Sequence, residues 1–121
     1  MAVEMWTYRE QGWTTGNLVD FKVEALDGSI GKIDEASYDV GAGYLVVDTG
    51  PWIFGHKVML PAGVVDRVDF DDEKVYVNRT KDEIKNAPEF DPDRYRDDAY
   101  RGQLGSYYGP GGAGWRDYEP S

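Results

Sequence analysis

The feature that most limits the fold is a series of short segments, between Leu18 and Asn78, in which apolar and polar residues alternate. In residues 19–25 every second side chain is apolar, which is the period of a strand with one buried face. Further short segments with apolar residues lie at residues 29–37, 44–47, 57–60, 64–70 and 75–77, with glycine, aspartate or proline turns between them. Residues 44–47 are a continuous apolar run, which indicates a central strand covered on both faces. We therefore expect five or six short strands without helices between them.

Two local features predict how these strands are arranged. Asp27-Gly28 tolerates positive φ angles and closes a tight hairpin between the first two strands. In the second strand Ile30 and Ile33 stand three apart around Gly31, which breaks the alternation and predicts a β-bulge or a bend. A small antiparallel sheet removes its exposed edges by curling up. The expected fold is mainly β: a small antiparallel, partly closed barrel.

The segments on either side of this barrel differ from it in composition. Thr80 and Glu83 have the spacing of a capping box, which predicts one short helix that Pro88 limits to about two turns. Residues 1–17 lack periodicity and are interpreted as an N-terminal arm, followed by a barrel domain over residues 18–90. Residues 91–121 lose apolar content and become rich in glycine and proline, which predicts a flexible tail.

Composition excludes several classes of function. Thirteen Lys and Arg against 23 Asp and Glu give a net charge of −10, which repels phosphate backbones and anionic lipid surfaces. The absence of cysteine excludes disulfides, thiolate zinc sites, iron–sulfur clusters and cysteine nucleophiles. No apolar run approaches the roughly 20 residues that cross a bilayer, and the N-terminus does not have the pattern of a signal peptide. We expect a cytoplasmic protein that neither inserts into membranes nor binds nucleic acid directly.

Several strand and turn segments resemble the PRC-barrel family. The similarity lies in residues 31–35, 44–50, 57–61 with Val64, 68–77 and 84–90, and it spans roughly residues 18 to 90. This family takes its name from the cytoplasmic barrel of the photosynthetic reaction-centre H subunit. It also includes a domain of the ribosome-maturation factor RimM and many small stand-alone bacterial proteins.

The resemblance implies a small, strongly bent antiparallel barrel that serves as a docking surface. Its motifs are structural turns and strands rather than catalytic signatures. The leading hypothesis is therefore a stand-alone bacterial PRC-barrel module, with a regulatory or stress-associated role, that binds other proteins and is not an enzyme. Two alternatives stay open: a ribosome-maturation or RNA-processing accessory factor that binds a ribosomal protein, and a role like that of the H subunit in photosynthetic electron transfer.

The residue types that usually carry chemistry do not form a recognisable motif. His56 is the only histidine, and no serine or carboxylate stands at a catalytic spacing from it. The carboxylates of residues 69–73 lack the spacing and the glycine of a calcium loop, so we expect a solvated hairpin tip. The glycine runs at residues 41–43 and 109–114 lack the lysine or the helix of a phosphate loop. No catalytic residue, metal site or cofactor is predicted.

Aromatic residues are the candidates for an interface. Trp52, Ile53 and Phe54 follow Gly50-Pro51 and cannot all face one side of a strand. Either at least one of them lies near the surface and marks an interaction site, or the loop folds under the barrel and buries all three. The aromatics of the arm pack on the barrel or on a partner. The candidates for a homodimer or partner interface are therefore Trp6, Tyr8, Trp13, Trp52, Ile53 and Phe54. A basic protein partner would suit the net charge of −10.

Overall fold

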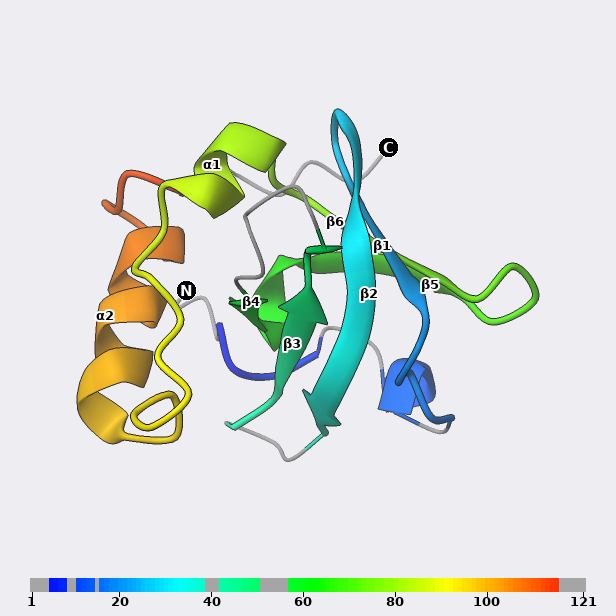
Figure 1. The fold of residues 1–121 in the computed structure, drawn as a ribbon, viewed down its shortest axis with the longest axis horizontal. Helices are drawn as coiled ribbons and strands as arrows, with labels where there is room; N and C mark the ends of the chain where they lie inside the picture. The colour runs from blue at the N-terminus through cyan, green and yellow to red at the C-terminus, as the bar shows by residue number, and fades with distance from the viewer. Residues whose placement is uncertain (1–4, 9–10, 15, 39–41, 51–56, 116–121) are drawn as a thin grey trace.

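The chain folds around one curled sheet. The computed structural model describes residues 5–8, 11–14, 16–38, 42–50 and 57–115 (Figure 1). Within these residues the strands are β1 (Lys22–Ala25), β2 (Gly28–Ser37), β3 (Tyr44–Asp48), β4 (Lys57–Pro61), β5 (Val65–Asp69) and β6 (Lys74–Val77). Their order in the sheet is β4-β3-β2-β1-β6-β5. The expected mainly β class is confirmed, because each of these strands overlaps a segment in which the sequence predicts one.

Two parts of the expected architecture are wrong. The sheet is mixed, because β1 and β6 pair in parallel while the other neighbours are antiparallel. It is also not closed into a barrel, since β4 and β5 end the strand order and no ladder joins them within the described residues. Short turns impose antiparallel pairing only on strands that are consecutive in the chain. They do not determine how β6 meets β1, which lies about 50 residues earlier in the sequence.

The start of β1 and the bend of β2 both have local causes. Val19 is exposed and Asp20 has a φ of 74°, so the chain turns there and the strand begins only at Lys22. Aspartate is one of the few residues that tolerate this left-handed conformation. The predicted bulge is confirmed: the register between β1 and β2 shifts at Val23/Glu24, beside Gly31 with a φ of 148°.

The predicted helix is confirmed as α1 (Lys81–Lys85). The backbone N–H of Glu83 donates to the Thr80 hydroxyl, and the Glu83 carboxylate accepts from the Thr80 N–H, so the capping box is complete. The Lys81 N–H also donates to the Asp27 carboxylate at 2.8 Å, which ties the β1–β2 turn to the helix. None of the helices in the described part of the chain combines the length and the apolar character needed to cross a membrane.

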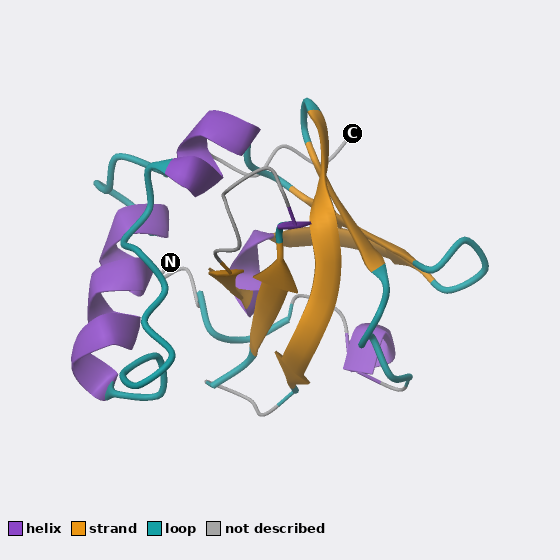
Figure 2. Ribbon diagram, in the orientation of Figure 1, coloured by secondary structure: helices purple, strands orange, loops and turns teal. Residues whose placement is uncertain are grey.

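A second helix lies where the sequence predicts a flexible tail. Helix α2 (Asp98–Tyr108) stands beside the sheet on the side opposite the β5–β6 hairpin (Figure 2). Tyr100, Leu104 and Tyr108 are buried, and their spacing of four residues places them on one face of the helix. The average composition of residues 91–121 conceals this face, because glycines and charged residues stand between its apolar side chains in the sequence. The segment therefore contributes to the core, and Trp115 beyond the helix packs against it as well.

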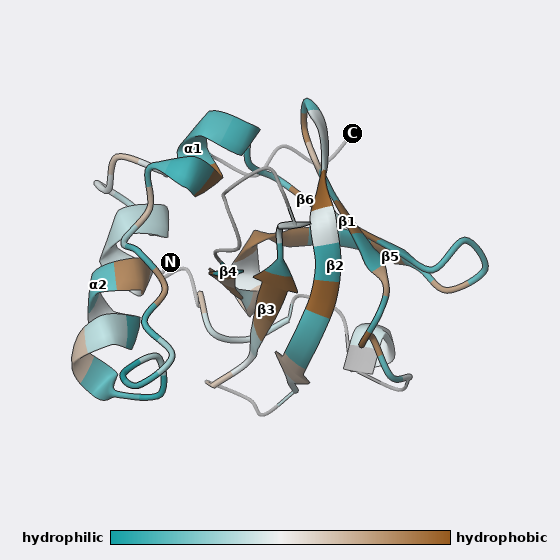
Figure 3. Cartoon of the chain, in the orientation of Figure 1, coloured by the Kyte–Doolittle hydropathy of each residue, from teal (hydrophilic) through white to brown (hydrophobic). Residues whose placement is uncertain are grey.

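The core lies between the inner face of the sheet, α1 and α2. Ribbon colour shows hydrophobic residues on β3 and β4, whereas the projecting end of the β5–β6 hairpin is mostly hydrophilic (Figure 3). Large side chains with at most 2% exposure that form this core include Leu18, Val23, Ile30, Ile33, Leu45, Val47, Leu60, Val64, Val75, Val77, Ile84, Leu104 and Tyr108. Met5, Tyr8 and Trp13 from the N-terminal segment join the same cluster. Both flanking segments therefore complete the core that the strands begin.

Candidate docking groove

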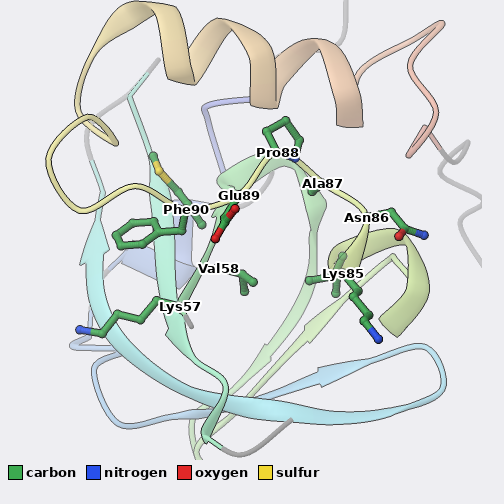
Figure 4. Close-up of a pocket in the computed structure, with 10 residues that line it drawn as sticks. Lys57, Val58, Lys85, Asn86, Ala87, Pro88, Glu89 and Phe90 are labelled. Atoms are coloured by element: carbon green, nitrogen blue, oxygen red, sulfur yellow. The ribbon is translucent and has the colours of Figure 1, made fainter. Parts of the chain in front are cut away.

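Two adjacent hollows lie along β4 and the segment that follows α1. The first has a volume of about 450 Å³ and is bounded by Val58 and Met59 of β4 and by residues 84–90 (Figure 4). The second, also about 450 Å³, is lined mainly by residues of β2 and β3 and by Pro92 and Tyr95. Lys57 and Phe90 line both hollows. We call the two together the β4 groove.

The walls of the first hollow are mostly apolar and its rim is charged. The apolar side chains are those of Val58, Met59, Ile84, Ala87, Pro88 and Phe90, and the charged ones are those of Lys57, Lys85 and Glu89. Figure 4 shows Val58 projecting into the space and the amino groups of Lys57 and Lys85 extending away from each other on opposite sides. An apolar side chain could therefore enter the hollow while polar groups around it remain in water.

Helix α2 holds the wall of this hollow in place. The Tyr107 hydroxyl donates to the backbone carbonyl of Glu83 at 2.6 Å, and the Tyr100 hydroxyl donates to that of Pro88 at 3.2 Å. Pro88 disfavours helical geometry at the residue before it, which is why the chain leaves α1 and runs extended past β4. Helix α2 therefore fixes the carbonyls of Glu83 and Pro88, and contacts within the fold define the shape of the hollow.

A carboxylate fastens the far end of the groove. Glu35 on β2 accepts hydrogen bonds from the hydroxyls of Tyr44 and Tyr95, and the Arg96 guanidinium lies 3.5 Å from the same carboxylate. The Tyr95 ring packs against Phe90 with centroids 5.0 Å apart. These contacts hold residues 90–96 against the outer face of β2 and β3, and they form the wall of the second hollow.

These contacts shift the pKa values of the ionisable groups in the groove. Partial burial raises the pKa of Glu35, but the hydrogen bonds from Tyr44 and Tyr95 and the charge of Arg96 outweigh it, so the pKa lies below its usual value. Burial, together with the hydrogen bond to Glu35, raises the pKa of Tyr44 to about 12. The hydrogen bond from Lys57 to Asp34, at 2.6 Å, raises the pKa of Lys57. At neutral pH, Glu35 is therefore ionised and Tyr44 protonated.

Glu35→Gln is expected to lower the free energy of unfolding by about 1 kcal/mol near neutral pH, because the charge-assisted hydrogen bonds become neutral ones in a partly exposed site. Since the pKa of Glu35 is lowered in the folded state, its contribution is present above the unfolded value of 4.5 and is lost as the pH falls through the folded value. Urea unfolding of both proteins at neutral and at acidic pH should therefore show a difference that disappears in acid.

The matched control for Glu35→Gln is Asp93→Asn, which makes the same kind of change at another acidic side chain. Its side chain is exposed and none of its oxygens takes part in the Glu35 cluster. We expect no comparable difference at neutral pH. Equal stability of wild type and Glu35→Gln at every pH would contradict the role given to Glu35.

The interface candidates of the N-terminal segment pack inside the protein. Tyr8 and Trp13 are 4% and 8% exposed, so neither offers an aromatic surface to a partner. The Tyr8 hydroxyl donates to the backbone carbonyl of Ser37 at 3.1 Å. Trp6 is half-buried, and the Arg101 guanidinium of α2 lies 4.8 Å from its ring centroid. Of the two expectations for these aromatics, packing on the protein's own sheet and helix is the one observed.

The other candidates are far from the groove or outside the described residues. Trp52, Ile53, Phe54 and His56 all lie outside the described residues. The carboxylates of residues 69–73 lie at the end of the β5–β6 hairpin, which extends away from the body (Figure 1). There the Asp69 carboxylate accepts the N–H groups of Asp71 and Asp72 at 3.0 Å, which stabilises the turn. Among the described residues, no three histidine or carboxylate side chains are grouped as metal ligands would be.

The groove itself was not predicted, because it joins segments that are distant in the sequence. Glu35 and Tyr95 are 60 residues apart. The one signal for the site is Pro88, which ends the helical segment and leaves Phe90 on an extended chain. Residue spacing does not reveal that this chain returns across β4 and β3.

Comparison with protein-family models finds no match to the chain, and a search of curated proteins finds no significant relative.

Proposed function

We propose that this protein is a non-catalytic docking module that binds a protein partner through the β4 groove. The observation that carries the proposal is the apolar hollow of about 450 Å³ beside β4, with lysine and glutamate side chains at its rim. Protein interfaces gain most of their binding energy from a few anchoring side chains that fill such pockets, while a polar rim excludes water. The volume lies within the range of pockets that enclose a bound group.

The rigidity of the hollow supports the same function. Its outer wall is held by hydrogen bonds from Tyr100 and Tyr107 of α2, and the adjacent segment is fastened through Glu35. A pocket that is formed before binding loses less conformational entropy when a partner side chain enters it. The fold therefore presents the groove in a form ready to bind.

The partner we propose is basic and inserts an apolar or aromatic side chain. The attraction for a basic surface comes from the net charge of −10 of the chain as a whole, because the rim of the first hollow itself carries Lys57, Lys85 and Glu89. The apolar walls select the side chain that enters the hollow. The resemblance of residues 18–90 to PRC-barrel proteins supports a docking role as well. We also propose that the sheet of this protein is of the PRC type and serves as its binding surface.

Ala87→Trp is expected to abolish partner binding, because the indole would occupy the hollow. Ala87 lines the first hollow and is half-buried. The matched control is Ala99→Trp, which places the same side chain on the exposed face of α2. Tagged wild type and both variants are incubated with native lysate at low and high salt, and the retained proteins are identified by mass spectrometry. Thermal unfolding of each variant verifies that it is folded.

We expect a set of proteins that wild type and Ala99→Trp retain and that folded Ala87→Trp loses. Retention should fall at high salt, because screening weakens attraction between opposite charges. Ribosomal proteins in this set would place the docking in ribosome maturation. If wild type and folded Ala87→Trp retain the same proteins, the groove is not the docking site and the proposal is wrong.

A further inference from the structure

The outer face of β1, β6 and β5 carries two parallel rows of polar side chains. On these strands Val23, Ala25, Val75 and Val77 face the core, so the residues that alternate with them face outward. The strand register aligns Glu24, Tyr76 and Arg67 in a first row across the three strands. It aligns Lys22, Lys74 and Asp69 in a second row. All six side chains are exposed or half-buried.

The first row has the composition of an interface. The Arg67 guanidinium stacks over the Tyr76 ring, 4.2 Å from its centroid. Tyrosine and arginine are among the residues that dominate binding energies at protein interfaces. The stacking also fixes the arginine before any partner arrives, which lowers the entropy lost on binding. Leu26, which is 53% exposed, borders the shallow hollow of about 570 Å³ that Glu24, Arg67 and Tyr76 line.

The charges of the two rows run in opposite directions. In the first row the acid is on β1 and the base on β5, as Glu24 and Arg67. In the second row the base is on β1 and the acid on β5, as Lys22 and Asp69. Together with Lys74, the six residues carry three positive charges and two negative ones, in a chain whose net charge is −10. The excess negative charge therefore lies outside these six residues, and the contacts at this face have to outweigh the repulsion between two copies that each carry a net charge of −10.

We propose that two copies of the chain associate through this face, about a two-fold axis that runs along β6. Such a rotation places β1 of one copy over β5 of the other. Glu24 then faces Arg67 and Lys22 faces Asp69, and the symmetry repeats both pairs. Tyr76 meets Tyr76 on the axis, where aromatic contact adds to the association. Lys74 meets Lys74, which is the one like-charge contact.

The dimer does not involve the β4 groove, so it goes beyond the docking function and is tested separately. The face consists of three strands of four or five residues. It is small compared with the roughly 800 Å² that each partner contributes to a standard stable interface. Association is therefore expected to depend on concentration and to be reversible. Ala87→Trp, in the groove, should leave it unchanged.

The test reverses the charges of the first row one at a time. Sedimentation velocity is measured for wild type, Arg67→Glu and Glu24→Arg from about 1 μM to about 1 mM, and for an equimolar mixture of the two variants. Each variant alone places like charges opposite each other twice, whereas the mixed dimer restores attraction at both positions. Arg94→Glu and Asp93→Arg change exposed charges away from this face and serve as matched controls. Thermal unfolding confirms that each variant is folded.

We expect a reversible wild-type dimer, at least tenfold weaker association of each single variant, and recovery of association in the mixture. The two controls should associate like wild type. A protein that stays monomeric up to about 1 mM would overturn the proposal. A dimer that neither reversal weakens would also overturn it, and so would a mixture that fails to recover association.

Discussion

A chain that ends at Phe90 is expected to lose its cooperative fold. Truncation there removes Tyr100, Leu104 and Tyr108, which are 7%, 1% and 0% exposed, and it uncovers the core surface against which they pack. Deleting one buried large side chain costs about 2–5 kcal/mol, whereas the total stability of a domain is about 5–15 kcal/mol. The free energy lost with three such side chains is therefore comparable to the total stability of the domain. Circular dichroism with thermal unfolding gives the measurement.

A point variant separates the role of α2 from the effect of a shorter chain. Leu104→Ala should lower the free energy of unfolding by about 3 kcal/mol, because the methyl groups that it removes lie in the core. Gln103→Ala, at an exposed position of the same helix, should change it by less than about 0.5 kcal/mol. If the truncated chain unfolded cooperatively at the wild-type temperature, α2 would not be part of the core.

Gly31→Ala is expected to destabilise the protein by about 3 kcal/mol. A Cβ atom at this position would lie 2.0 Å from the backbone carbonyl oxygen of Asp48, and the φ of 148° is one that side chains rarely adopt. The atom that it meets is backbone, so relief requires β2 and β3 to separate where they pair. Urea unfolding of wild type and variant gives the difference in stability.

Gly102→Ala is the matched control, and it should raise the stability of the protein rather than lower it. Nothing lies within 4 Å of the position that its Cβ would take, and it stands inside α2 on an exposed surface. Alanine at such a position favours the helix by about 1 kcal/mol. Equal effects of the two substitutions would show that Gly31 is not held by the close approach of β3.

Local patterns in the sequence predict the local structure well. Alternation of apolar residues locates β1 and β6 because a strand with one buried face has a period of two, and β3 is located by a continuous apolar run. Thr80 and Glu83 predict the start of α1 because the side chain of each accepts a hydrogen bond from the backbone N–H of the other, within four residues of the chain. Gly31 predicts the bulge for a similar reason, since both the broken alternation and the missing side chain are visible in the sequence. Each of these features depends on neighbours in the chain.

Features that depend on distant contacts were not predictable in this way. The parallel pairing of β6 with β1 follows from how the β5–β6 hairpin returns to the sheet, and no residue in either strand encodes that direction. Tyr100, Leu104 and Tyr108 do carry a helical signal, but glycines and charges between them dilute it. The groove depends on Glu35, Phe90 and Tyr95, which come together only when the segment after α1 crosses the sheet.

The β4 groove and the face of β1, β6 and β5 have different proposed functions. The β4 groove is apolar inside and is held rigid by α2 and Glu35, which suits an inserted side chain from a partner. The face of β1, β6 and β5 is nearly neutral and carries oppositely directed charge rows, which suits a second copy. A dimer of this kind would present two grooves, and a partner with two docking segments would bind it more tightly than a monomer.

The most direct test of groove docking is a nuclear magnetic resonance titration of isotope-labelled protein with the partner that wild type retains and Ala87→Trp loses. We predict that the amide signals of Val58, Ala87 and Phe90 shift or broaden on binding, while those of Glu24 and Tyr76, on the outer face of β1 and β6, stay in place. Changes confined to residues outside the groove, with Val58, Ala87 and Phe90 unaffected, would contradict the docking function.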